Sequence, residues 1–92
     1  MTSKAVIVTN QLGLHARAAA RFVNAATRFA SQIRVTRGDR SMDGKSIMGI
    51  LLLAAARGTS IVISAEGMDE AAAVEALARL VESGLGEDTW NG

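Results

Sequence analysis

The chain has 92 residues, of which 49% are hydrophobic and 3% aromatic, so a core of aliphatic side chains can form. It contains no cysteine, which excludes a disulfide framework, a thiolate metal site and a cysteine nucleophile. The net charge of +1 conceals an asymmetry: residues 1–57 carry nine Lys and Arg against two acids, net +7, whereas residues 58–92 carry one Arg against seven acids, net −6.

A basic and an acidic surface follow if the fold keeps these two parts of the chain separate. Nucleic acid is not expected as the partner of the basic surface, because stacking platforms need aromatic side chains. The longest apolar run, Ile47–Ala56, is too short to span a bilayer, and the N-terminus lacks the pattern of a signal peptide. We therefore expect a soluble cytoplasmic domain without a membrane segment.

Hydrophobic patterning predicts seven elements in the order β-α-β-β-α-β-α. In chain order they are a strand at Lys4–Thr9, a helix from Ala16, strands at Gln32–Arg37 and Arg40–Met42, a helix from Ser46 to about Ala56 with Gly58 as its C-cap, a strand at Ser60–Ala65 and a helix from Asp69. This order predicts an α+β domain, a two-layer open-faced sandwich in which three helices cover one face of a four-stranded antiparallel sheet. From Gly84 onward the chain is expected to be a frayed polar tail.

The first predicted helix is amphipathic. Phe22, Ala26 and Phe29 recur at helical spacing and are expected to face the core. The opposite side carries a basic stripe at the same spacing, made of Arg17, Arg21, Asn24 and Arg28.

The only histidine, His15, stands directly before this helix, in the position of a capping residue. The first N–H groups of a helix have no intrahelical partners, so this end binds a phosphate readily. A phosphoryl group on the imidazole could accept hydrogen bonds from the amides of Ala16 and Arg17, and the Arg17 guanidinium could pair with its charge. Gly13 leaves the approach to the histidine uncrowded. From the spacing alone, a tolerated turn residue and a nucleophile both remain open.

Ser46 is expected to cap the second helix. The Gly-Lys-Ser sequence that it ends does not form a P-loop, which requires a glycine where Asp39 stands. The Arg-Gly-Asp sequence at 37–39 is interpreted as a turn between two strands and not as an adhesion motif.

The second predicted helix is apolar on every side, and a helix in a two-layer domain cannot bury all of its faces. We expect Ile50 and Leu53 to point into the core. The remaining apolar residues should form an exposed docking patch, with arginines at its rim. The patch residues are Ile47, Met48, Leu51 and Leu52, and the rim residues are Arg17, Arg21 and Arg28.

Two segments, LGLHAR at 12–17 and GKSIMGILLLAA at 44–55, resemble the signature segments of HPr, the histidine phosphocarrier family of the bacterial phosphoenolpyruvate-dependent phosphotransferase system. The predicted order of elements agrees with this family. The resemblance covers roughly residues 4–85. We therefore expect an HPr-like domain at 1–86, and the polar sequence after it predicts a flexible C-terminal tail at 87–92.

The resemblance implies a role for each candidate residue. His15 would be phosphorylated on Nδ1 by enzyme I and would pass the phosphoryl group to a histidine of an enzyme IIA, with Arg17 as phosphate partner. Ser46 matches the position that HPr kinase/phosphatase modifies in bacteria that possess that enzyme. The protein would then be a monomeric carrier rather than an enzyme, with no metal or cofactor and no nucleic-acid or membrane partner.

Ala18 is one departure from the family pattern, because many members have proline there. Proline is tolerated in a first helical turn, and its absence should change stability by only about 0.4–1 kcal/mol. The departure leaves open whether the chain serves the sugar-transport or the nitrogen-related branch.

Two other interpretations remain open. The first is a ferredoxin-like regulatory binding module without phosphotransfer, although the chain lacks both a Cys-x-x-Cys motif and strand aromatics. The second is an HPr-like regulator that acts only through Ser46.

Overall fold

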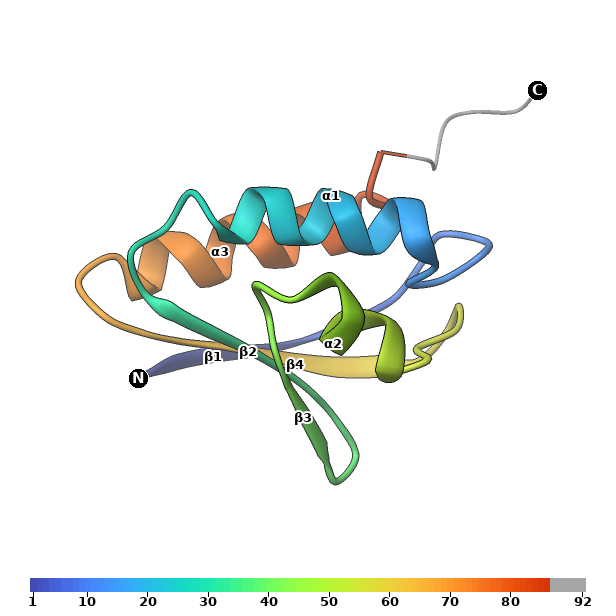
Figure 1. Ribbon diagram of the computed structural model, residues 1–92, viewed down its shortest axis with the longest axis horizontal. Helices are drawn as coiled ribbons and strands as arrows, with labels where there is room; N and C mark the ends of the chain where they lie inside the picture. Colours follow the sequence, from blue (N-terminus) through green and yellow to red (C-terminus); the bar gives the residue numbers. More distant parts are fainter. Residues whose placement is uncertain (87–92) are drawn as a thin grey trace.

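The computed structural model, which describes residues 1–86, is an open-faced sandwich with its helices on one side of the sheet (Figure 1). The elements are β1 (Thr2–Ile7), α1 (Ala16–Ala26), β2 (Gln32–Arg37), β3 (Arg40–Asp43), α2 (Ile47–Leu52), β4 (Ser60–Glu66) and α3 (Glu70–Glu82). The four strands form one antiparallel sheet in the order β1-β4-β2-β3. The predicted element order and fold class are confirmed.

The core lies between the sheet and the helices. Alternation along the strands turns one set of aliphatic side chains inward, for example Val35 on β2 and Ile63 on β4, which are opposite each other in the register and fully buried. α1 contributes Phe22 and Ala26 to this core, as predicted, and α3 contributes Leu77. The other face of the sheet carries no helix (Figure 1). Both α1 and α2 have exposed residues as well as buried ones, so each presents one face to solvent.

Some predicted boundaries differ from the structure. β1 begins and ends two residues earlier than Lys4–Thr9, although Val8 continues the pairing through its amide, which donates to the Thr59 carbonyl at 2.9 Å. β3 includes Asp43, and Glu66 extends β4 by one residue. β2 has its predicted bounds, because its alternation is flanked by turns on both sides.

The predicted end of the second helix is wrong. α2 stops at Leu52, with Leu53 as its C-cap, and Ala54 has a left-handed backbone with φ +52°. Gly58 is not its C-cap, because its amide donates to the Val8 carbonyl at 2.8 Å in the connection to β4. The apolar composition of residues 47–56 contains no signal for the earlier end.

The prediction of a frayed tail from Gly84 is wrong for the described part of that segment. Leu85 is fully buried, and its amide donates to the Leu80 carbonyl at 2.9 Å. Its carbonyl accepts a hydrogen bond from Arg21 Nη1 at 2.9 Å, which ties the segment to α1. The remainder of the predicted tail, residues 87–92, lies outside the described residues.

Two carboxylates fasten the start of α3 to other elements. Asp69 accepts from the amides of Ala30 and Ser31 and from the Ser31 hydroxyl, and these bonds, the hydroxyl's above all, hold its pKa below the ordinary value. Glu70 accepts from the Thr2 hydroxyl at 2.6 Å, and this bond contributes most to lowering its pKa to about 2. The acidic α3 is thereby joined to β1 and to the connection between α1 and β2.

Candidate functional site

The loop before α1 is closed by Asn10. Its side-chain amide donates to the Gly13 carbonyl at 2.7 Å, and the Gly13 amide donates to the Asn10 carbonyl at 3.1 Å. Asn10 is 2% exposed, so these bonds form inside the protein. An asparagine after a strand ordinarily indicates only a turn, so this contribution cannot be read from the sequence.

Gly13 is required by this loop for two reasons. Its φ of +67° lies in the left-handed region, where residues with a side chain are strained. A Cβ atom at this position would also lie 2.4 Å from the Ala55 carbonyl oxygen and 2.8 Å from the Ala56 Cα. The loop therefore packs directly on Ala55 and Ala56, in the segment that follows α2. We call these two residues the floor of the site. The next residue, Leu14, donates its amide to the Ala55 carbonyl at 2.9 Å.

His15 is the N-cap of α1, as predicted. Its backbone is extended (φ −82°, ψ −177°), and its carbonyl accepts the Ala19 amide at 2.7 Å. The imidazole makes no capping hydrogen bond to the helix and is half-buried. The first turn of α1 contains no acidic residue, so nothing within the helix neutralises the positive end of its dipole.

The predicted phosphate partners Ala16 and Arg17 come directly after His15 in the chain. Ala16 and Arg17 are exposed in the first turn of α1, where amide groups lack intrahelical acceptors. Arg21 lies one turn further along, and its Nη1 atom is bound to the Leu85 carbonyl. Arg28 is exposed but lies beyond the end of α1 at Ala26, so the basic stripe is not helical over its whole predicted length.

Ser46 caps α2, as predicted. Its Oγ accepts the Gly49 amide at 3.0 Å, and its backbone is extended. The preceding Lys45 crosses to the connection between α1 and β2, where its Nζ donates to the Phe29 carbonyl at 2.7 Å. Ser46 therefore lies at one end of α2, and the floor of the His15 loop follows the other end.

Three of the four residues predicted to form the docking patch are exposed. Ile47, Met48 and Leu52 are 42%, 65% and 53% exposed, whereas Ile50 and Leu53 are fully buried as predicted. Leu51, also predicted to be exposed, is instead partly buried against the core. A six-residue helix has room for only a narrow outer face, and Leu51 lies at its edge.

Leu12 is a further exposed apolar residue, at 71% exposed in the loop that precedes His15. A lone leucine in a turn has no periodicity, so its exposure cannot be predicted from the sequence. It gives the site loop an apolar tip.

A polar groove of about 250 Å³ lies elsewhere, lined by residues 30–34 together with Asp43 and Lys45. It contains none of the predicted site residues. Among residues 1–86 there is no group of three or more side chains that could hold a metal ion, and no helix there is long and apolar enough to cross a membrane.

A small α+β domain that places its only histidine at the positive end of a helix has the architecture of a phosphoryl carrier. Comparison with known proteins identifies the carrier. Residues 2–83 match the family model described as "PTS HPr component phosphorylation site". The chain therefore belongs to the HPr family of phosphocarrier proteins of the phosphotransferase system, as the two sequence motifs indicated.

Similar proteins agree over nearly the full length. The chain is 45% identical over 87 residues to phosphocarrier protein HPr of Neisseria meningitidis strain MC58, covering 95% of this chain and 98% of the relative. It is 44% identical over 88 residues to HPr of Pseudomonas aeruginosa, covering 95% and 98%. The crystal structure of HPr-C-His from Thermoanaerobacter tengcongensis superimposes with a TM-score of 0.91 at 45% identity, covering 95% of this chain and 98% of the other.

Proposed function

We propose that this HPr-family protein accepts a phosphoryl group on His15 from phosphorylated enzyme I and passes it to a histidine of an enzyme IIA component. The observation that carries the proposal is the position of His15 directly before the first turn of α1, where the helix dipole favours an anion. Family membership supports the same chemistry.

In the proposed transfer, the lone pair of His15 Nδ1 attacks the phosphorus of the donor phosphohistidine. A new N–P bond forms as the donor N–P bond breaks, and the donor imidazole keeps that electron pair. The amides of Ala16 and Arg17 donate to the phosphoryl oxygens, and the Arg17 guanidinium offsets their charge. Transfer to enzyme IIA repeats the exchange with His15 as the leaving group, so neither a metal nor a cofactor is required.

Incubation with labelled phosphoenolpyruvate and enzyme I tests the proposal. An acid-labile, base-stable label should appear on the protein, and His15→Ala should abolish it. Label that persists in His15→Ala, or no label on the wild type, would favour the binding module without phosphotransfer. Arg17→Ala should still accept the label but pass it on slowly. Arg79 is an exposed arginine on α3, so Arg79→Ala serves as the matched control and should transfer the label at the wild-type rate.

We propose that the partners dock on the exposed residues of α2, with Ile47, Met48 and Leu52 at the apolar centre and Arg17 at the rim. Replacement of Met48 by Ser should raise the KM for enzyme I more than it lowers kcat, because it removes contact area from the patch and leaves His15 in place. An unchanged KM would exclude the patch.

Ser46 phosphorylation by an HPr kinase/phosphatase is proposed as the regulatory step. A phosphate at the start of α2 suits the helix dipole and would not melt the helix. It would place negative charge beside the docking patch and weaken the binding of an acidic partner. Ser46→Asp should therefore slow transfer from enzyme I, and Ser3→Asp on the exposed side of β1 should not. An unchanged rate in Ser46→Asp would refute this regulation.

The protein is proposed to act as a monomer in the cytoplasm, with an HPr domain at 1–86. Related structures include an HPr dimer from Thermoanaerobacter tengcongensis and the swapped dimer of Bacillus subtilis Crh, which is 39% identical with a TM-score of 0.74. Light scattering at working concentration distinguishes a monomer from a dimer, and the mass of a dimer would contradict the proposal.

A further inference from the structure

The turn between β2 and β3 is flanked by two arginines, Arg37 and Arg40, whose side chains do not stabilise the hairpin itself. Arg37 and Arg40 are directly opposite each other in the strand register, and like charges in this arrangement repel. Gly38 between them has φ +60°, and a Cβ atom added there would have no other atom within 4 Å, so the turn itself is open. Both guanidinium groups reach α2 instead.

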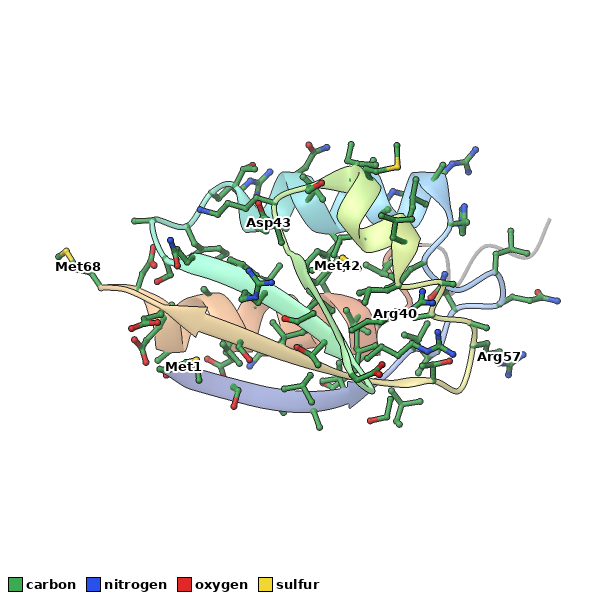
Figure 2. All side chains as sticks on the ribbon, turned by 60° about the horizontal axis from the view of Figure 1, so that its bottom comes forward. Met1, Arg40, Met42, Asp43, Arg57 and Met68 are labelled. Carbon is green, nitrogen blue, oxygen red and sulfur yellow. The ribbon has the colours of Figure 1, made fainter. Side chains whose placement is uncertain are left out.

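The two arginines bind the last carbonyls of α2. Arg40 Nη1 donates to the Leu52 carbonyl at 3.0 Å, and Arg37 Nη1 donates to the Leu53 carbonyl at 2.8 Å. Figure 2 labels Arg40 beside the end of this helix. These carbonyls lack intrahelical donors, and α2 has no basic residue in its own last turn. We name Arg37 and Arg40 the arginine clamp.

The segment held by the clamp leads directly into the floor of the candidate site. Leu53 is followed by Ala54 in a left-handed conformation that alanine rarely adopts, and then by Ala55, whose carbonyl accepts the Leu14 amide at 2.9 Å. Only Ala54 thus separates Leu53, whose carbonyl Arg37 binds, from Ala55, whose carbonyl supports the loop. Leu14, which donates to Ala55, directly precedes His15 in the chain. An unfavourable backbone conformation persists only where its surroundings enforce it.

We infer that Arg37, assisted by Arg40, is a positioning residue for phosphoryl transfer. By holding the Leu53 carbonyl it fixes the height of the Ala55 carbonyl, and through the Leu14 amide it fixes the orientation of His15. This inference rests on the proposed role of His15 as the phosphate acceptor. Transfer between two proteins depends on such placement, since a misplacement of about 1 Å can cost roughly 100-fold in rate.

Arg37→Met tests the inference, because methionine keeps much of the side-chain length and loses the donors. The kcat for transfer from enzyme I should fall about tenfold, in keeping with the loss of one charge-assisted hydrogen bond, while KM stays constant because Arg37 lies outside the docking patch. Hydrogen exchange at the Leu14 amide should rise by a similar factor. Exchange at the fully buried Ile63 reports global unfolding and should rise less.

Two further variants separate positioning from general destabilisation. Arg37→Lys keeps one cationic donor and should restore most of the rate. Arg34→Met on the same strand removes an arginine that donates only to Ser41 and should leave both kcat and Leu14 exchange unchanged.

Three outcomes would overturn the inference. They are an unchanged kcat in Arg37→Met, equal increases in exchange at Leu14 and Ile63, or no rescue by lysine. A wild-type protein that takes no label would instead refute the proposed function, and the exchange measurements would still decide whether the clamp orders the loop.

Discussion

Replacement of Gly13 by alanine measures how much free energy of unfolding depends on the close packing of the His15 loop against Ala55 and Ala56. Gly38→Ala is the matched control, because its φ of +60° is close to the +67° of Gly13 and no atom lies within 4 Å of its Cβ position. The control bears only the left-handed penalty of about 1–2 kcal/mol, offset by about 0.4–1 kcal/mol from the stiffer unfolded chain. Gly38→Ala should therefore cost about 0.5–1 kcal/mol.

Gly13→Ala bears the same penalty for a left-handed backbone and, in addition, a steric penalty. Its Cβ would lie 2.4 Å from the Ala55 oxygen, and since that atom belongs to the backbone, the loop must lift from the floor. Overpacking costs about 1–3 kcal/mol, and stretching the Leu14–Ala55 bond adds to it. The expected total is about 2–4 kcal/mol.

Thermal unfolding followed by circular dichroism checks these values. About 4–8 °C is expected per kcal/mol in a domain of this size, so Gly13→Ala should lower Tm by roughly 10–25 °C and Gly38→Ala by only a few degrees. Labelling by enzyme I should also slow in Gly13→Ala at temperatures where it remains folded. If the two variants differ by less than about 0.5 kcal/mol, the packing of the loop on Ala55 does not constrain this position.

Three further predictions concern stability. Ser46→Ala removes the hydroxyl that accepts the Gly49 amide and should cost about 1 kcal/mol in urea unfolding; no loss would mean that the cap is replaced by water. Ala54→Gly relieves the left-handed backbone and should raise stability by about 0.5 kcal/mol, and a decrease would mean that the strain is absent. The pKa of Glu70 is lowered from 4.5 to about 2, so its ionised form stabilises the folded state above pH 4.5 and loses that effect as pH falls toward 2. The fall of Tm over this range should be shallower in Glu70→Gln, and an identical fall would exclude Glu70 as its source.

The elements with a clear period could be predicted from the sequence. β2 has its predicted bounds because Ile33 and Val35 alternate with polar residues between two turns. The capping positions of His15 and Ser46 could also be predicted, because each directly precedes a helical pattern and a serine is common at such a position. In these cases the local sequence and the final contacts favour the same structure.

The remainder depended on contacts between distant residues. α2 ends at Leu52, where arginines from the β2–β3 hairpin bind the carbonyls of Leu52 and Leu53, and the apolar run contains no indication of these contacts. Leu85 is buried although a single leucine among glycines has no period to reveal its partners. Asn10 closes the site loop from inside the protein, and only its burial distinguishes it from an ordinary turn residue.

The position of β4 in the middle of the sheet bears on the order in which the protein is made. β1 pairs with β4, with Val6 opposite Ile61, so the first strand has no neighbour until the ribosome has produced residue 66. At about 5–20 residues per second, His15 precedes that moment by roughly 3–10 s. Ala55, whose carbonyl accepts the Leu14 amide, is also made after His15, so until residue 55 has been produced a nascent chain displays the histidine without this support. The sheet and the support of the site are therefore both completed only in the second half of synthesis, because each joins parts of the chain that lie far apart in the sequence.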